Sequence, residues 1–380
     1  MKNNRRGFIK KSASLVAAAS LGSMSSSIAN SPDHTKSNRI SALSKDAGMQ
    51  ASEAYFAGMD ERKIALSKQM EVFGAVGGIN PKMVGMENAK AYEEKSVLAV
   101  KEAWAKVGLK FNVVEGPPSL GEKTKLGLQG RDEEITNFIT LMKSLSKVGI
   151  DVICYNWMPV IGWYRTDNAR PGRGNALMTA FDYESIKDAP LTSYGAVTKE
   201  TLWKNLEYFL KAVIPEAEKV GMKLAMHPDD PQVDSIKGIS RIMTSVDNFK
   251  KLVDLVPSPS NGITMCQGNF SLMGADIPTT VNYFGKRKLI HFVHFRNVQD
   301  LSGNKPSTKF TETFHDEGQI DMYAAMKAYY EIGFKGPIRP DHVPTMAGDS
   351  NDFPGYSTIG SLYAWGYIKG LMEAVQKNQG

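Results

Sequence analysis

The chain has 380 residues, of which 42% are hydrophobic and 23% are charged, and its formal net charge is +6. Five of these positive charges lie on Lys2, Arg5, Arg6, Lys10 and Lys11, so the remainder of the chain is nearly neutral. The sequence has no basic stripe with interleaved aromatic residues, and no apolar run reaches the roughly 18 residues that span a bilayer. We therefore expect neither nucleic-acid binding nor a membrane span.

The first 29 residues have the pattern of an export signal. Residues 4–10 read NRRGFIK, an apolar stretch follows at residues 15–21, and residues 27–29 form a small-residue cleavage signal. This order is typical of a twin-arginine signal peptide, whereas the alternative, a basic tail before a disordered leader, does not call for a cleavage signal. We expect the twin-arginine export machinery to recognise residues 1–29 and the mature protein to be periplasmic.

Residues 30–68 are rich in Ser, Ala, Lys and Asp and contain no convincing strand, so we interpret them as a linker with an N-terminal helical segment. The rest of the chain, residues 69–380, is long enough for one large core in a single domain. The two cysteines, Cys154 and Cys266, are too few for a disulfide framework. Stability is expected to come from the core.

One unit recurs four times from residue 70 onward: a helix with apolar residues at helical spacing, then Val or Ile, then Gly, then an apolar residue that opens a strand. A Gly in that place is typical of a helix C′ position, where a left-handed backbone is easiest for a residue without a Cβ. The four copies are Val107-Gly108-Leu109, Val148-Gly149-Ile150, Val220-Gly221-Met222 and Ile332-Gly333-Phe334.

Eight candidate strands alternate with helices, at residues 71–76, 110–115, 151–155, 223–227, 262–266, 289–295, 309–314 and 336–341, the seventh being the weakest. Eight βα units predict a single-domain α/β fold, the (β/α)₈ or TIM barrel. An open doubly wound sheet is the alternative, but no G-x-G-x-x-G follows a strand. The nearest P-loop match, residues 116–124, has Glu122 where Lys is required.

Histidines gather around the later strands. Five of the six histidines fall in or just after predicted strands of the second half, and a TIM barrel carries its active site at the C-terminal ends of its strands. His291 and His294 are three residues apart and so point to opposite faces, with His294 nearer the catalytic end. The five are His227, His291, His294, His315 and His342.

A divalent metal needs several donors that converge on one point, and neighbouring barrel strands deliver them from distant parts of a sequence. His227, Cys266, His294 and Asp341 would form such a set. Each alone is more simply a satisfied core residue, but together they predict a metal site. The segment His227-Pro228-Asp229-Asp230-Pro231 has the composition of a polar turn, yet two carboxylates beside a histidine at a strand end favour a functional loop.

Six segments resemble the mannonate dehydratase family, and the resemblance runs from about residue 71 to the C-terminus. Any one segment is unspecific, whereas the six in this order are specific. They are Cys154-Tyr155-Asn156-Trp157-Met158-Pro159, Tyr164-Arg165-Thr166-Asp167, His227-Pro228-Asp229-Asp230-Pro231, Gly262-Ile263-Thr264-Met265-Cys266, His291-Phe292-Val293-His294-Phe295-Arg296-Asn297 and Arg339-Pro340-Asp341-His342.

The resemblance implies a barrel of the xylose-isomerase-like group that holds Mn²⁺, or alternatively Fe²⁺ or another divalent cation, on His227, Cys266, His294 and Asp341. It implies that the substrate is a small sugar acid, D-mannonate, which is dehydrated to 2-keto-3-deoxy-D-gluconate. A thiolate with two imidazoles suits Zn²⁺ or Fe²⁺ equally well, so the choice of Mn²⁺ rests on the resemblance alone.

The same resemblance implies that His342 and Tyr356 move the protons, without settling which is the base and which the acid. Removal of a proton α to a carboxylate and loss of the β-hydroxyl need one group of each kind. Arg296 and, more weakly, Arg165 are candidate anchors for the substrate carboxylate, with surface ion pairs as the alternative for both. Further candidate substrate-binding residues are Asn156, Asp229, Asn297 and His315.

Two departures from the family pattern concern the substrate. Val343 stands where the family has Gly, and the segment around His315 is shorter; an export signal is also unusual for a step of cytoplasmic uronate breakdown. Three functions therefore stay open: a sugar-acid dehydratase, which the site residues favour, an isomerase or epimerase of neutral sugars on the same metal barrel, and a noncatalytic carbohydrate-binding barrel. A homo-oligomer is compatible with each.

Overall fold

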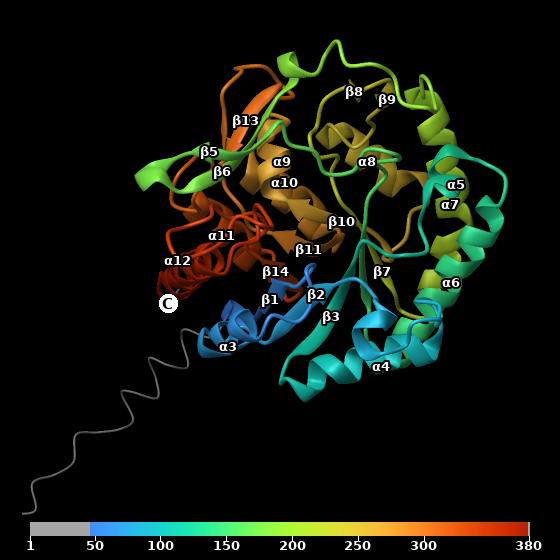
Figure 1. Cartoon of the computed structure of the whole chain (residues 1–380), viewed down its shortest axis with the longest axis horizontal. Coiled ribbons are helices and arrows are strands. Elements are labelled where there is room, and N and C mark those ends of the chain that lie inside the picture. The colour runs from blue at the N-terminus through green and yellow to red at the C-terminus, as the bar shows by residue number, and fades with distance from the viewer. Residues whose placement is uncertain (1–45, 379–380) are drawn as a thin grey trace, which may run out of the picture. The chain divides into compact units, whose positions relative to one another are not determined.

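Eight parallel strands close into a barrel and follow one another around it in chain order (Figure 1). This computed structural model describes residues 46–378, so the expected signal peptide at residues 1–29 and the expected linker at residues 30–45 lie outside the described residues. The TIM barrel prediction is confirmed. The strands are β1 (Gln50–Ala54), β2 (Gly74–Gly77), β3 (Lys110–Glu115), β4 (Val152–Tyr155), β7 (Lys223–Met226), β10 (Asn261–Cys266), β11 (Ile290–His294) and β14 (Pro337–Arg339).

The first strand, β1, corrects the expected domain boundary. It closes the barrel by pairing with β14 on one side and with β2 on the other. The linker prediction is therefore wrong from residue 50 onward, and the barrel begins there rather than at residue 69. The sequence QASEA contains no β-branched or aromatic residue, so pairing with two neighbours, rather than intrinsic propensity, makes this segment a strand.

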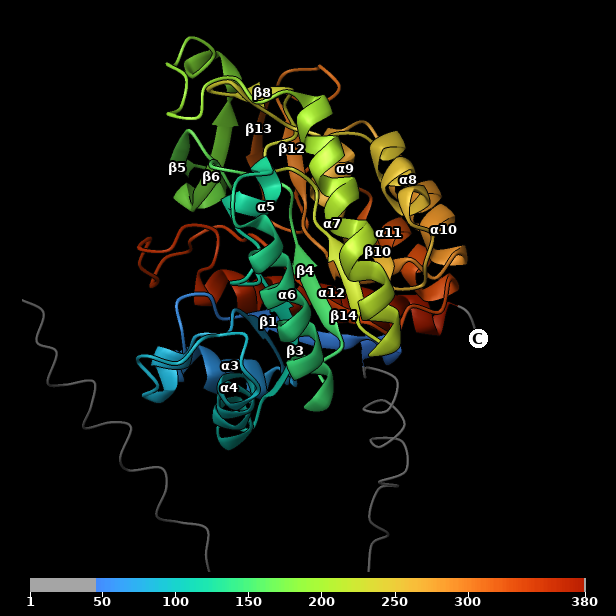
Figure 2. The same ribbon diagram turned by 90° about the vertical axis from the view of Figure 1, so that its right-hand side faces the viewer.

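Residues 309–314, expected as the seventh barrel strand, belong to a second sheet. Strand β13 (Lys309–Glu312) pairs antiparallel with β12 (Val298–Asp300) and with β6 (Leu177–Asp182), and β5 (Asp167–Pro171) completes the four-stranded order. The pattern indicated a strand correctly, but it does not say which sheet a strand joins. Both views place β5, β6 and β13 on the side of the molecule away from α3 (Glu61–Gln69) and α4 (Glu94–Lys106) (Figure 2).

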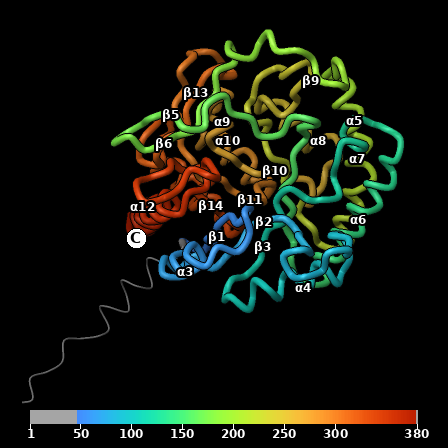
Figure 3. Tube along the Cα trace, in the orientation of Figure 1, coloured from blue at the N-terminus to red at the C-terminus, as the bar shows by residue number. Residues whose placement is uncertain are grey.

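Eight longer helices of the described residues surround the barrel. Figure 3 shows the path of the chain through strands and helices in the orientation of Figure 1. The glycines that end four of these helices have positive φ, namely 82° at Gly108, 75° at Gly149, 67° at Gly221 and 67° at Gly333, which confirms the predicted C′ positions. Besides α3 and α4, the long helices are α6 (Arg131–Lys147), α7 (Lys199–Lys219), α8 (Val246–Leu255), α10 (Ile277–Lys286), α11 (Met322–Glu331) and α12 (Thr358–Lys377); the short elements include α5 (Glu122–Leu126), α9 (Gln267–Leu272), β8 (Ser235–Ile236) and β9 (Ile239–Ser240).

Apolar side chains fill two layers. The larger cluster packs the helices against the outside of the barrel and includes Phe138, Phe209 and Tyr329. The smaller one fills the barrel interior with Val76, Val113, Val152, Cys154, Ala225 and Phe292. Because the interior is filled, polar side chains of the strands gather where the strands end. No helix among residues 46–378 has the length and apolar character to cross a membrane.

Candidate active site

Three neighbouring strands end side by side at the candidate site. Cys266 closes β10 and is in register with His294 of β11, which is in register with Arg339 of β14. His227 directly follows β7, and Asp341 lies two residues after β14. Parallel strands bring their C-terminal ends to one face of the barrel, so residues from four distant parts of the chain meet there.

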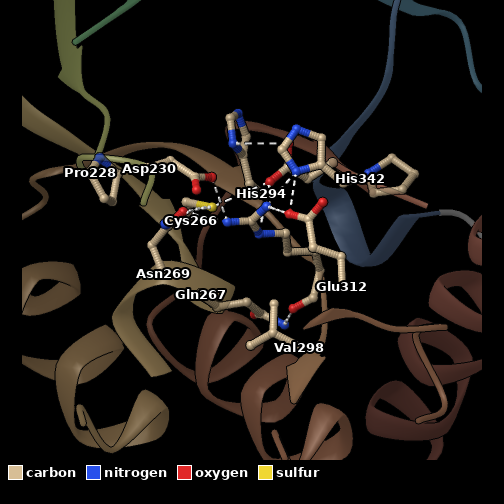
Figure 4. A network of polar contacts seen from close by, with 12 residues as sticks. Pro228, Asp230, Cys266, Gln267, Asn269, His294, Val298, Glu312 and His342 are labelled. Carbon is tan, nitrogen blue, oxygen red and sulfur yellow. Dashed lines mark hydrogen bonds and ion pairs between the residues drawn. The ribbon is translucent and has the colours of Figure 1, made fainter. Parts of the chain in front are cut away.

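The four predicted metal ligands surround one point, with Cys266 and His294 seen in Figure 4. His227 Nε2 lies 3.1 Å from His294 Nδ1, Cys266 Sγ lies 3.3 Å from Asp341 Oδ2, and His294 Nδ1 lies 3.6 Å from Asp341 Oδ1. His227 Nδ1 is 2.7 Å from the Pro228 carbonyl oxygen, which only accepts, so Nδ1 carries the proton and Nε2 keeps its lone pair. The ligand atoms of His227, Cys266 and His294 lie close enough together to hold one divalent ion, and the Asp341 carboxylate lies beside Cys266 and His294.

Burial favours the neutral, metal-binding form of the two histidines, but it disfavours the thiolate form of Cys266. Desolvation lowers the pKa of His227 to about 4 and also lowers that of His294, so both imidazoles are neutral at pH 7. Desolvation raises the pKa of the Cys266 thiol well above its ordinary value. A bound cation has to displace that proton, because the thiolate is the form that binds metal.

The buried charges of the site leave an excess of negative charge. Three arginines, Arg165, Arg296 and Arg339, are paired with four carboxylates. Once Cys266 is a thiolate the excess is two, which one divalent cation balances. Without a cation Cys266 keeps its proton and the excess is one, so the negative charge of the site favours a bound cation. The carboxylates are those of Glu115, Asp230, Glu312 and Asp341.

Asp341 has a left-handed backbone, with φ at 66°, which residues other than glycine rarely adopt. Such strain persists where the surroundings impose it, and it concentrates at functional sites. The Asp341 carboxylate lies 2.9 Å from Arg339 Nη1 and 3.2 Å from Arg296 Nε. Although burial acts to raise its pKa, the neighbouring His342 and Arg339 hold the pKa of Asp341 well below its ordinary value. Asp341 is therefore a fixed carboxylate.

His342 and Tyr356 form a hydrogen-bonded pair beside the metal-binding cluster. His342 Nε2 lies 3.0 Å from Tyr356 Oη, and its Nδ1 lies 2.6 Å from Glu312 Oε1, a neighbour seen in Figure 4. The same Nδ1 also contacts Arg296 Nη1, which only donates, whereas Glu312 only accepts. In the tautomer with Nδ1 protonated toward Glu312, Nε2 accepts the O–H of Tyr356. Burial raises the pKa of Tyr356 well above its usual range, so the phenol stays protonated.

Neither arginine expected to anchor a substrate carboxylate is free to do so. Arg165 donates to Asp230 at 2.6 Å and to Glu312 at 2.7 Å, and Arg296 donates to Asp230 at 2.9 Å and also pairs with Glu312. Both side chains are fully buried. Carboxylates of the protein itself pair with both guanidinium groups, and neither arginine lies on the wall of the cavity, which Arg339 lines.

Three further candidates support the fold instead of lining the cavity. Asp229 accepts two backbone N–H groups at 2.7 and 2.8 Å, Asn297 donates to two backbone carbonyls at 3.2 and 3.3 Å, and His315 bonds a backbone carbonyl at 3.0 Å. None of the three lies on the cavity wall, whereas Asp230 does. The sequence named the wrong member of the Asp229–Asp230 pair because it does not show which way each carboxylate turns.

The site opens into a cavity of about 120 Å³. Asn156 lies on its wall as expected, and its Oδ1 accepts the Lys125 ammonium and the Met158 N–H, both at 3.1 Å, which leaves the amide NH₂ to meet a ligand. Sequence reasoning missed Glu115, although its place at the end of β3 was an available signal. The other cavity residues it missed include Trp163, Asp230 and Arg339.

Comparison with known proteins gives a consistent result. The profile of the D-mannonate dehydratase family matches residues 49–193 and 185–380. Mannonate dehydratase 2 of Halalkalibacterium halodurans is 34% identical over 355 residues, which cover 86% of this chain and 99% of that protein.

Solved structures add the same relationship. The crystal structure of mannonate dehydratase from Streptococcus suis serotype 2 is 31% identical, with a TM-score of 0.77 over 87% of this chain and 95% of that chain. A structure of L-ribulose 3-epimerase is 10% identical, with a TM-score of 0.54 over 87% of this chain and 97% of that chain, and so shares the fold alone. With the profile, the relative and the crystal structure in agreement, the chain belongs to the D-mannonate dehydratase family.

Proposed function

We propose that this protein is a metal-dependent hydro-lyase that converts D-mannonate to 2-keto-3-deoxy-D-gluconate and water. The observation that carries the proposal is that one cavity is lined by His227 and Asp341 of the candidate metal cluster and by the hydrogen-bonded pair of His342 and Tyr356. Membership of the family supports the same reaction.

The reaction removes the proton on C2 and expels the hydroxyl on C3, so it needs a base, an acid and stabilisation of charge that develops on the carboxylate. A bound divalent cation supplies that stabilisation. We assign the base to His342 Nε2, whose lone pair faces Tyr356, and the acid to Tyr356, which keeps its phenolic proton. Glu312 holds the imidazole in the required tautomer and stabilises its cationic form.

Two residues of the cavity wall contribute to the binding of the sugar-acid substrate in this proposal. Arg339 lines the cavity and is paired with Glu115 and Asp341, so it contributes positive charge at the cavity wall and is not a free anchor. Asn156 offers an amide N–H to an oxygen of the substrate, because its carbonyl oxygen is already bonded twice.

For the metal we propose Mn²⁺ on His227, Cys266, His294 and Asp341, with Fe²⁺ as the alternative. The donor set is compatible with several divalent ions, since thiolate and imidazole also bind Zn²⁺. The metal content of the protein, measured by mass spectrometry after purification from its native host, distinguishes the three.

The proposed reaction is tested by incubating the Mn²⁺-loaded protein with a panel of aldonic acids that includes D-mannonate, and by detecting the 2-keto-3-deoxy product. We expect turnover of D-mannonate that is lost in Cys266→Ala. An Asp188→Ala variant is the control, because Asp188 is exposed and lies outside the active-site cavity. No turnover of any acid by protein that has bound metal contradicts the proposal.

The same experiment separates the rival functions. An isomerase or epimerase interconverts neutral sugars and leaves aldonic acids unchanged, and a noncatalytic barrel binds a sugar without product. The likeness to L-ribulose 3-epimerase concerns the fold and does not favour epimerisation.

We also propose that residues 1–29 direct the protein through the twin-arginine machinery to the periplasm. The support is the sequence NRRGFIK and the cleavage signal that follows it. Cell fractionation of the Arg5→Lys, Arg6→Lys double variant is expected to show the precursor retained in the cytoplasm. Periplasmic mature protein in that variant contradicts the proposal.

A further inference from the structure

A second cavity lies beside the active-site cavity, and Tyr356 lines both. Its volume is about 190 Å³, compared with about 120 Å³ for the cavity at the metal-binding cluster. One wall is the segment that follows β1, including Phe56, and the other is the segment before α12, including Phe353. The second cavity is therefore built by two segments at the strand ends, one of which carries Tyr356.

The two cavities share an aromatic wall. The ring of Tyr356 lies 5.2 Å from the ring of Phe56 and 5.2 Å from that of Phe353, while its other neighbour is the His342 ring at 5.1 Å. Phe353 is 45% exposed, so its ring is accessible to a ligand in the second cavity. A continuous aromatic surface thus runs from the proton-moving pair into the second cavity.

The polar groups of the second cavity are available to a ligand. Within residues 46–378, the side chains of Ser350 and Asp352 make no hydrogen bond or ion pair, and both residues are exposed. The Arg62 side chain is 55% exposed and pairs with Asp349 through Nη1, which leaves its other N–H groups free. Aromatic faces with a few unpaired acceptors and donors are the composition of a small-molecule site, and hydroxyl groups satisfy both kinds of partner.

We propose that the second cavity is a carbohydrate subsite, which receives a glycosyl substituent on the far end of the sugar acid while the acid itself occupies the first cavity. The preferred substrate is then an aldonic acid with a glycosyl group on O4, O5 or O6. The inference rests on the proposed dehydratase function. The bonds that change are still C2–H and C3–O, so the substituent is a spectator that adds binding energy.

The test compares kcat/KM of the Mn²⁺-loaded protein for D-mannonate and for D-mannonate with a glucosyl group on O4, O5 or O6. We expect at least one substituted acid to exceed D-mannonate by about 10-fold, the effect of about 1.4 kcal/mol of added transition-state binding. If D-mannonate is turned over and every glycosylated acid is slower, the subsite is refuted and the dehydratase function stands. If no acid is turned over, both fail.

Two variants locate the effect. Asp352→Ala removes an unpaired acceptor, and Ser350→Trp places bulk in the second cavity. Both are expected to lower kcat/KM for the favoured glycosylated acid by about 10-fold, as the loss of about 1.4 kcal/mol does, and to leave D-mannonate within about twofold. Asp188→Ala, an exposed position outside both cavities, is the control. A favoured acid whose kcat/KM is unchanged by both variants refutes the assignment of this cavity.

Discussion

At the scale of single residues, His342 and Tyr356 hold different protons, and this separates their roles. Tyr356→Phe keeps the base, so the variant should still exchange the C2 hydrogen of D-mannonate with D₂O while dehydration falls by about 10² to 10⁴. His342→Gln should lose both exchange and dehydration. Proton NMR of the substrate in D₂O measures the exchange; exchange that survives in His342→Gln and is lost in Tyr356→Phe reverses the assignment.

Lys125 is expected to act through Asn156. Its ammonium holds the Asn156 carbonyl oxygen at 3.1 Å and so turns the amide NH₂ toward the cavity. Lys125→Met should raise KM for D-mannonate by about fivefold, the effect of a net hydrogen bond of about 1 kcal/mol, with kcat little changed. Lys125→Arg should restore part of the loss, and Lys123→Met, at an exposed position of the same helix, should have no effect. An equal loss of kcat in Lys125→Met contradicts a positioning role.

The carboxylate of Glu312 should make the fold sensitive to acid. Although burial acts to raise its pKa, Arg165, His342 and Arg296 lower it from 4.5 to about 2. The unfolded chain therefore takes up this proton first, so the free energy of unfolding should decrease as the pH falls from about 4.5 to about 2. Denaturant titrations across this range should show a smaller decrease in Glu312→Gln than in the exposed control Glu331→Gln. Identical pH dependence in the two variants contradicts the ion-pair account.

The convergence of His227, Cys266, His294 and Asp341 was predictable because side chains at the C-terminal ends of barrel strands meet at one face of the barrel. The arginines were not, because their partners come from elsewhere. Glu312, which occupies both Arg165 and Arg296, belongs to the second sheet, and its pairing with them depends on contacts far apart in the sequence. A sequence shows that a guanidinium is present but not that the protein has already neutralised it.

At the scale of elements, β1 is the piece on which barrel closure depends. A protein that begins at Asp46 should fold, whereas one that begins at Glu61 lacks β1 and exposes the edges of β14 and β2. Thermal unfolding followed by circular dichroism should be cooperative for the first protein and absent or broad for the second. Cooperative unfolding of the shorter protein at the same temperature contradicts the role of β1.

The sequence predicted the elements correctly where the local residue pattern matched the environment of the element in the fold. Seven of the eight expected barrel strands are in the barrel, and four glycines mark helix ends as predicted. β1 was missed because its small and polar residues match no strand pattern; its Glu53 is buried, with Lys63 Nζ at 3.0 Å and the Trp365 indole at 2.9 Å as partners. β13 was assigned to the wrong sheet because the alternating pattern of a strand does not show which strands it pairs with.

At the scale of the whole molecule, the barrel strands, the second sheet and the segments that follow the strands all contribute residues to one cluster of buried charged groups. In the proposed function a bound cation balances the negative charge of this cluster. Metal removal should therefore affect stability as well as activity, since a ligand that binds only the folded state stabilises it. We expect chelation to lower the midpoint of thermal unfolding and Mn²⁺ to restore it, with a smaller response in Cys266→Ala. A midpoint that chelation leaves unchanged contradicts a metal that bridges these strands.

The measurement that tests the central claim most directly is the rate of 2-keto-3-deoxy-D-gluconate formation from D-mannonate as Mn²⁺ is added back to metal-free protein. One site formed by His227, Cys266, His294 and Asp341 predicts no turnover without metal and a linear rise that saturates at about one ion per chain, given tight binding by a four-ligand site. Full turnover by the metal-free protein, or none at any Mn²⁺ content, would contradict the account.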